Sequence, residues 1–174
     1  MRALLVPLIV LSLAMLPAAA TATTFTDVTI EDLARASDLV IIGRVEHVDV
    51  HPHGPAGQPG IHTRAVVQVA ETLRGEHRTI VEVWVHGGRI GNRMRVVPGQ
   101  ATFRAGEDVA LFLFDAGGGL WPTGMGRGKW SIQPGNLPLL PEHRDGLRLS
   151  SAAGTSMEEL RVAVGSAGGA GRRP

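Results

Sequence analysis

The sequence contains no cysteine among its 174 residues. This absence excludes the disulfide framework on which many exported domains rely. It also excludes a cysteine nucleophile, and no G-x-S-x-G turn is present to carry a serine nucleophile. Paired carboxylates are scarce as well, because Glu107 and Asp108 are adjacent and adjacent strand residues point to opposite faces. The sequence therefore predicts a protein without enzymatic activity.

Long apolar runs are limited to one segment, residues 3–16, which follows Arg2. A proline and several small residues come next, completing the pattern of a secretory signal peptide with an A-x-A cleavage site. An uncleaved membrane anchor is the alternative, but the run is shorter than the ~20 apolar residues needed to cross a bilayer. We expect residues 1–22 to be removed by cleavage after Ala22 or after Ala20. The mature protein is then secreted or periplasmic and no longer attached to the membrane.

An excess of charge of either sign is also missing. Lysine and arginine total 17 and aspartate and glutamate total 16, so loss of Arg2 with the signal peptide leaves 17 − 1 = 16 basic residues against 16 acidic ones. A near-neutral exported protein without a basic stripe is a poor candidate for nucleic-acid binding. We therefore expect no nucleic-acid partner.

The residues that are present alternate in the manner of β-strands over most of positions 23–164, which we predict to be one domain. A short helix is predicted near residues 29–36, capped by Thr29, and a second near residues 155–164, ended by Gly165, with a disordered tail over 165–174. A long loop is expected at 87–106, with a short extended piece at 93–97. Five main strands are predicted, at residues 38–50, 61–73, 79–86, 109–114 and 120–132, the last broken by glycines at 124, 126 and 128.

The first predicted strand changes the side on which its polar residues fall. Arg44 and Glu46 are polar at even positions, whereas His47, Asp49 and His51 are polar at odd positions. One face of a strand cannot be both solvent-exposed and packed on the core, so we expect a β-bulge near Glu46 and His47. A bulged strand and long hairpins favour an all-β fold, a small closed β-barrel of OB-like type with flanking helices. A β-sandwich is the alternative.

The order of several segments resembles the netrin-like OB-fold domain of the tissue inhibitors of metalloproteinases. The resemblance rests on "ASDLVIIGRV", "HTRAVVQVAETLRG", "TIVEVWV" and "FRAGEDVALFLF", followed by a glycine-rich closing strand, and covers residues 33–132. The sequence is more similar still to a group of exported bacterial proteins of uncharacterised role. In the inhibitors an N-terminal cysteine chelates the zinc of the protease. Here the expected mature terminus is Thr23 (or Thr21), so the resemblance implies the fold and a protease-interacting role without that cysteine.

The stretch "HVDVHPHG" places His51, His53 and Asp49 on one side of an extended chain. If the first hairpin sets His62 across from His53, these four side chains converge, and imidazoles suit zinc, copper or nickel. Arg64, placed across from His51 in that register, would repel a cation. A solvated hairpin face is therefore the favoured interpretation, and a metal site is the alternative.

Trp84 and His86 fall on the even side of their predicted strand, opposite a run of valines. They are candidates for a partner-binding surface together with the N-terminal Thr23, although Trp84 is also suited to capping one end of the barrel. These patterns together predict an exported, non-catalytic binding module whose partner is a protein, with an exported protease as the candidate. A weak transition-metal-binding protein and an unrecognised hydrolase are the alternatives, and no bound cofactor is required.

Overall fold

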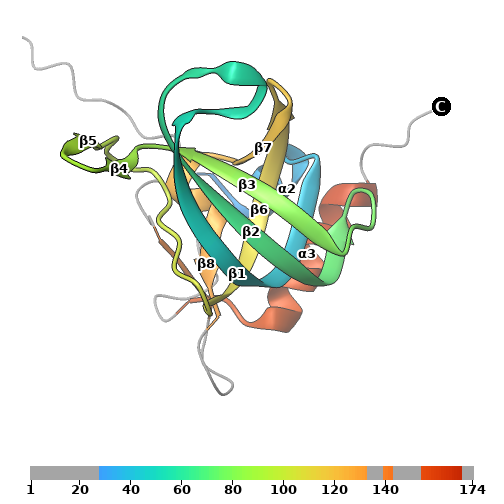
Figure 1. Cartoon of the computed structure of the whole chain (residues 1–174). Coiled ribbons are helices and arrows are strands. Elements are labelled where there is room, and N and C mark those ends of the chain that lie inside the picture. Colours follow the sequence, from blue (N-terminus) through green and yellow to red (C-terminus); the bar gives the residue numbers. More distant parts are fainter. Residues whose placement is uncertain (1–27, 133–138, 143–153, 170–174) are drawn as a thin grey trace, which may run out of the picture.

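The structure, a computed structural model, describes residues 28–132, 139–142 and 154–169. Its centre is a ring of strands in which each strand is hydrogen-bonded to the next and β6 pairs back with β1 (Figure 1). The five strands of the ring are β1 (Leu39–His53), β2 (Pro59–Arg74), β3 (Ile80–His86), β7 (Gly119–Pro122) and β6 (Asp108–Ala116). The all-β, barrel-like fold predicted from the sequence is confirmed. The predicted signal peptide and Thr23 lie outside the described residues.

The last strand of the barrel is interrupted. β7 and β8 (Lys129–Ser131) both pair with β6 in antiparallel fashion, with Leu113 opposite Pro122 and Leu111 opposite Lys129. The residues between them leave the sheet and form the 3-10 turn η2 (Met125–Gly128). The predicted break at the glycines of the fifth strand, 120–132, is confirmed, because these glycines lie in or beside η2. The break is an excursion out of the sheet rather than a simple kink. β9 (Leu140–Pro141) extends the sheet beyond β8.

The bulge predicted in β1 is confirmed. Val45 pairs with Val67 but His47 pairs with Val66, so Glu46 is an extra residue on β1. The bulge moves Val48 to the side of the barrel interior, where it packs against the core. The long β1–β2 hairpin curves as a result, and its end rises above the ring of strands (Figure 1).

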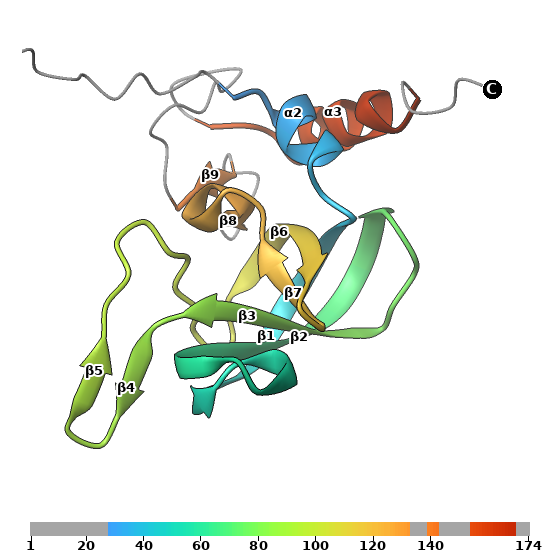
Figure 2. The same cartoon turned by 90° about the horizontal axis from the view of Figure 1, so that it is seen from above.

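The strand β6 is buried on both sides, as its unbroken apolar sequence predicts. Val109, Leu111 and Leu113 point into the barrel core, whereas Ala110 and Phe112 belong to a second core on the outside of the barrel. The second core lies under the helices α2 (Ile30–Arg35) and α3 (Met157–Gly169), which pack side by side on one face of the barrel (Figure 2). The fully buried Trp130 is part of it.

The helix ends follow local chemistry. Thr29 caps α2, since its Oγ1 accepts a hydrogen bond from Asp32 N at 3.1 Å and the Asp32 carboxylate accepts one from Thr29 N at 3.1 Å. The predicted end of the second helix is wrong, because α3 continues through Gly165 to Gly169. The apolar stripe that begins at Leu160 extends to the buried Ala167, and packing of that stripe outweighs the low helix propensity of glycine.

No helix in the described ranges, α2 and α3 included, is long and apolar enough to cross a membrane.

Candidate functional site

A β-hairpin projects from the rim of the barrel after β3 (Figures 1 and 2). It consists of β4 (Gly88–Ile90) and β5 (Arg93–Arg95), in which Arg89 pairs with Met94. The sequence predicted only an extended piece here, without β4. Gly88 has φ +133 and lies so close to β1 and β2 that a Cβ would be 2.6 Å from Val50 Cγ1 and 2.8 Å from Thr63 Oγ1. Glycine is therefore required where the hairpin leaves the barrel.

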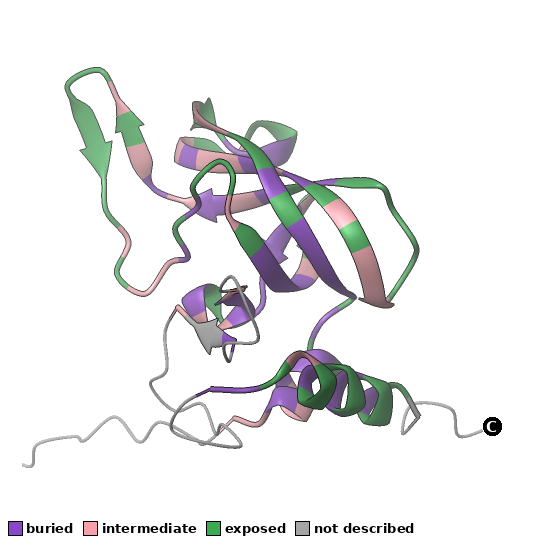
Figure 3. Ribbon diagram, turned by 90° about the horizontal axis from the view of Figure 1, so that it is seen from below, coloured by how far each residue is buried: buried purple, intermediate pink, exposed green. Residues whose placement is uncertain are grey.

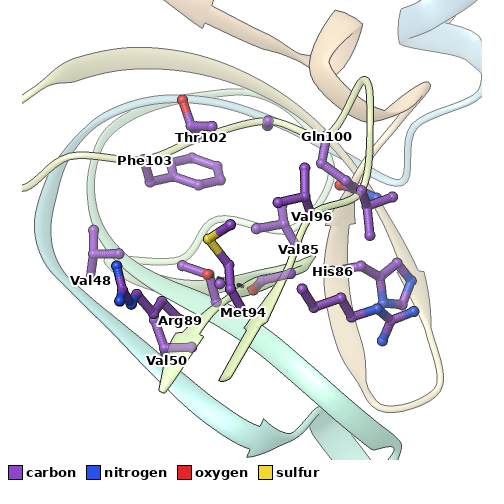
Figure 4. Close-up of a pocket in the computed structure, with 16 residues that line it drawn as sticks. Val48, Val50, Val85, His86, Arg89, Met94, Val96, Gln100, Thr102 and Phe103 are labelled. Atoms are coloured by element: carbon purple, nitrogen blue, oxygen red, sulfur yellow. Dashed lines mark hydrogen bonds between the residues drawn. The ribbon is translucent and has the colours of Figure 1, made fainter. Parts of the chain in front are cut away.

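A cavity of about 450 Å³ opens between this hairpin, the barrel and the loop that returns from β5. The end of β1 supplies Val48, the end of β3 supplies Val85, and the return loop supplies Phe103. Met94 of the hairpin reaches over the same hollow (Figure 4). We call this opening the barrel mouth, and its lining residues are Val48, Val50, Thr63, Val85, His86, Gly87, Gly88, Arg89, Met94, Arg95, Val96, Val97, Gln100, Ala101, Thr102 and Phe103.

A second cavity, of about 530 Å³, lies on the other side of the return loop and shares His86, Val97 and Gln100 with the first. Large apolar side chains stand exposed around both cavities: Met94 is 66% exposed, Val96 70% and Met125 38%. The hairpin itself is mostly exposed (Figure 3). Apolar side chains gathered around a concave, polar-rimmed surface are typical of a binding site.

The charged side chains that line the mouth itself, Arg89 and Arg95, are both positive. Residues 87–106 contain four arginines and no aspartate or glutamate. Arg89 donates from Nε to the carbonyl of Gly91 at 3.1 Å. Within the described part of the chain, the guanidinium groups of Arg93, Arg95 and Arg104 form neither an ion pair nor a hydrogen bond. The stretch 87–106 therefore carries a net positive charge although the whole chain is nearly neutral.

One wall of the mouth is fixed by a buried charge. Lys129 is only 4% exposed, and its Nζ lies 2.9 Å from Glu107 and 3.5 Å from Glu142. Lys129 also donates to the carbonyl of Thr102, whose backbone N and Oγ1 donate to Glu142 at 3.0 and 2.6 Å. These bonds hold Thr102, and with it the neighbouring Phe103, against β8. The wall is thus held in place by contacts within the protein itself.

His86 lies at the boundary of the two cavities. Its ring centroid is 4.7 Å from that of Trp121 and 4.9 Å from that of His62. Its Nδ1 is buried and has no hydrogen-bond partner among the described residues. Burial lowers the pKa of His86, and the neighbouring His62 and the Arg95 charge lower it further. His86 is therefore a neutral, mainly packing side chain near pH 7.

The proposed metal ligands are not brought together. His51, and not His53, lies opposite His62, so the predicted register is wrong by two residues. The reason is a further irregularity between His51 and His53, next to the hairpin end, which the parity of the sequence does not reveal. His62 is buried beneath the hairpin end, and a Cβ on Gly54 would lie 3.1 Å from its ring, whereas His53 is exposed.

Asp49 is occupied by other partners. It lies opposite Arg64 and accepts hydrogen bonds from it at 2.7 and 3.1 Å, and His51 Nε2 lies 2.9 Å away. The Arg64 hydrogen bonds, with help from His51, lower the pKa of Asp49 to about 2. No cluster of three or more histidine and carboxylate side chains suited to a metal occurs in the residues that the structure describes.

The residues predicted to form a partner surface do not all lie at the mouth. His86 does line the mouth, but Trp84 lies elsewhere, half-buried between the Arg64 guanidinium at 5.9 Å and the His51 ring at 5.5 Å. Met94 and Phe103 were not predicted as site residues. The signal that pointed to them in the sequence was the acid-free, arginine-containing stretch 87–106.

Compared with known proteins, the chain matches no protein-family model and no curated protein sequence.

Proposed function

We propose that the protein is an exported, non-catalytic binding module that docks a protein partner at the barrel mouth. The observation that carries this proposal is the exposure of Met94, Val96 and Met125 around two apolar cavities. Proteins without a partner rarely leave such a patch in water, because burying apolar surface is favourable by roughly 25 cal/mol per Å².

The arrangement of the mouth also supports binding rather than catalysis. Its walls are valines, methionine and phenylalanine, and the one histidine that lines it, His86, has a lowered pKa and no carboxylate partner among the described residues. A rigid barrel that presents a projecting hairpin is a common way to position a recognition surface.

Export is supported by the signal-like residues 1–22. The resemblance of residues 33–132 to metalloproteinase inhibitors makes an exported protease the candidate partner. Without an N-terminal cysteine, contact through the mouth replaces zinc chelation in this proposal.

The mature protein, immobilised and exposed to secreted and periplasmic proteins of its source, tests the proposal. Wild type should retain a partner that Met94→Asp and Val96→Asp lose. Val162→Asp is the matched control, since Val162 is 63% exposed on α3 and lies outside the mouth. A retained protein is then assayed for protease activity with and without the module. Identical binding by all four proteins would contradict docking at the mouth.

A further inference from the structure

We propose that the partner segment bound at the barrel mouth is acidic and carries a large apolar side chain that enters the 450 Å³ cavity. This inference rests on the proposed function and adds the chemistry of the partner. It follows from two independent properties of the mouth, the shape of its apolar floor and the unbalanced charge of its rim.

The floor can accept an apolar anchor. Val48 and Val85 come from the ends of two barrel strands, and Phe103 is held in place through Thr102 and Lys129. Three rigid elements thus surround a hollow large enough for a bulky side chain. Met94 covers it from the hairpin, and the unbranched thioether can repack around different anchors. Interfaces commonly obtain most of their affinity from one such side chain in a pocket.

The rim selects the charge that accompanies the anchor. Arg89 and Arg95 line the same cavity as Met94, and Arg93 is adjacent on β5. No carboxylate of the described chain neutralises these three side chains. Guanidinium groups bind carboxylates through two parallel hydrogen bonds, so an acidic segment supplies what the rim lacks.

Arginines elsewhere in the molecule do have carboxylate partners. Arg44 pairs with Asp108 at 3.1 Å, Arg64 with Asp49 at 2.7 Å, and Arg161 with Glu71 at 2.8 Å. Acidic residues are as numerous as basic ones in the mature chain, yet none lies in the stretch 87–106. The unpaired arginines are therefore concentrated where the apolar cavity opens.

An anionic lipid surface would also attract arginines and apolar side chains. A concave floor argues against it, because a flat bilayer cannot place a side chain in a cavity that is walled on the barrel side by Val48, Val85 and Phe103. A protein segment can do so, and the proposal commits to that occupant.

The probe is a displayed library of random peptides, selected against the mature full-length protein. Enriched peptides should combine aspartate or glutamate with one leucine, methionine, phenylalanine or tryptophan. Binding of a selected peptide should weaken by about tenfold or more in the variant Arg89→Glu/Arg93→Glu/Arg95→Glu, because three attractive contacts at the exposed rim become repulsive. Replacing the acidic residues of the peptide by lysine should restore binding to that variant.

A matched control carries the same change in net charge on other faces: Arg44→Glu/Arg78→Glu/Arg161→Glu. These arginines form exposed ion pairs away from the mouth, so the variant should leave peptide binding intact even though each new glutamate lies beside a carboxylate. Replacing the apolar residue of the peptide by serine, and Met94→Asp in the protein, test the anchor. Thermal melting of each variant verifies that it is folded.

The inference is overturned if the enriched peptides are not acidic, if no peptide is enriched, or if both charge variants bind equally. It is also overturned if phosphatidylglycerol vesicles, and no peptide, bind in a manner that depends on the three mouth arginines. If a natural partner still requires Met94 and Val96 in any of these cases, the proposed function stands and only the chemistry of the partner is wrong.

Discussion

Asp49 and Arg64 face each other across the β1–β2 hairpin and are joined by hydrogen bonds of 2.7 and 3.1 Å. The same guanidinium donates to Glu82 of β3 at 3.0 Å, so one arginine connects three neighbouring strands on the outer surface of the barrel. Both Asp49 and Arg64 are 27% exposed, which leaves their attraction only partly screened by water. The Asp49 carboxylate, one of the four candidate metal ligands, is therefore already bonded to Arg64 and His51.

Asp49→Asn should lower the free energy of unfolding at neutral pH. It should also make that free energy depend less on pH in acid. Because the pKa of Asp49 is lowered from 3.8 to about 2, its contribution is present above pH 3.8 and is lost as the pH falls through 2. The contribution is about 2 kcal/mol, from the size of that shift. Urea unfolding between pH 2 and 6 measures it. Asp108→Asn, in the exposed pair with Arg44, is the control and should retain the acid dependence of wild type.

His86 should make the protein less stable in mild acid. Since burial lowers its pKa in the folded state, the unfolded chain binds more protons just below pH 6.5, and stability falls as the pH drops through this value. His86→Gln should remove part of this slope, as measured by melting temperature from pH 8 to 5. His77→Gln alters an exposed histidine in the β2–β3 turn and should not. Equal slopes in both variants would mean that His86 does not cause the effect.

Lys129→Met should destabilise the protein by about 3 kcal/mol, because a buried pair that loses one partner leaves the other charge unpaired. Glu107 and Glu142 are the charges left behind. The double variant Lys129→Met/Glu107→Gln should recover part of the loss in a double-mutant cycle. A change in unfolding free energy within about 0.5 kcal/mol, as is usual for a surface substitution, would show that Lys129 does not hold the wall of the mouth.

Gly43→Ala should destabilise the barrel by roughly 2 kcal/mol through overpacking. A Cβ at Gly43 would collide with the carbonyl oxygen of Gln68 and would lie 2.9 Å from Val67 Cγ1. Chemical denaturation gives the change in unfolding free energy. A neutral result would mean that β1 and β2 are farther apart in solution.

Gly165→Ala should instead stabilise the protein. Gly165 lies inside α3, and a Cβ there would meet no heavy atom within 4 Å. Alanine in a helix interior is about 0.5–1 kcal/mol more favourable than glycine. The melting temperature should therefore rise, and a fall would show that the helix ends before this residue, as the sequence alone suggested.

The features that were predicted correctly depend on short-range patterns. The polar residues of β1 change sides at Glu46, which reveals the bulge, and the unbroken run from Val109 to Phe114 indicates burial on both faces. Thr29 and Asp32 are three residues apart, which is sufficient to identify a helix cap.

The features that were missed depend on residues far apart in the chain. The register at the end of the first hairpin depends on where Gly54 meets His62, and no local pattern encodes that contact. The cavity places Val48 next to Phe103, fifty-five positions later, once the barrel has closed. β4 consists of Gly88, Arg89 and Ile90 and has a glycine on either side, so it shows none of the alternation by which strands are recognised.

The strands β1 and β6 each contribute side chains to both cores, and this limits where the sequence can diverge during evolution. A substitution in the segment of either strand that is buried on both faces, residues 39–43 or 109–113, disturbs the barrel interior or the layer beneath the helices. The hairpin of residues 88–95 contributes to neither interior, so it can diverge, lengthen or be exchanged while the barrel keeps its shape. We expect related proteins to differ most in this hairpin, with one conserved scaffold carrying many specificities, and a transplanted hairpin to carry its binding preference with it.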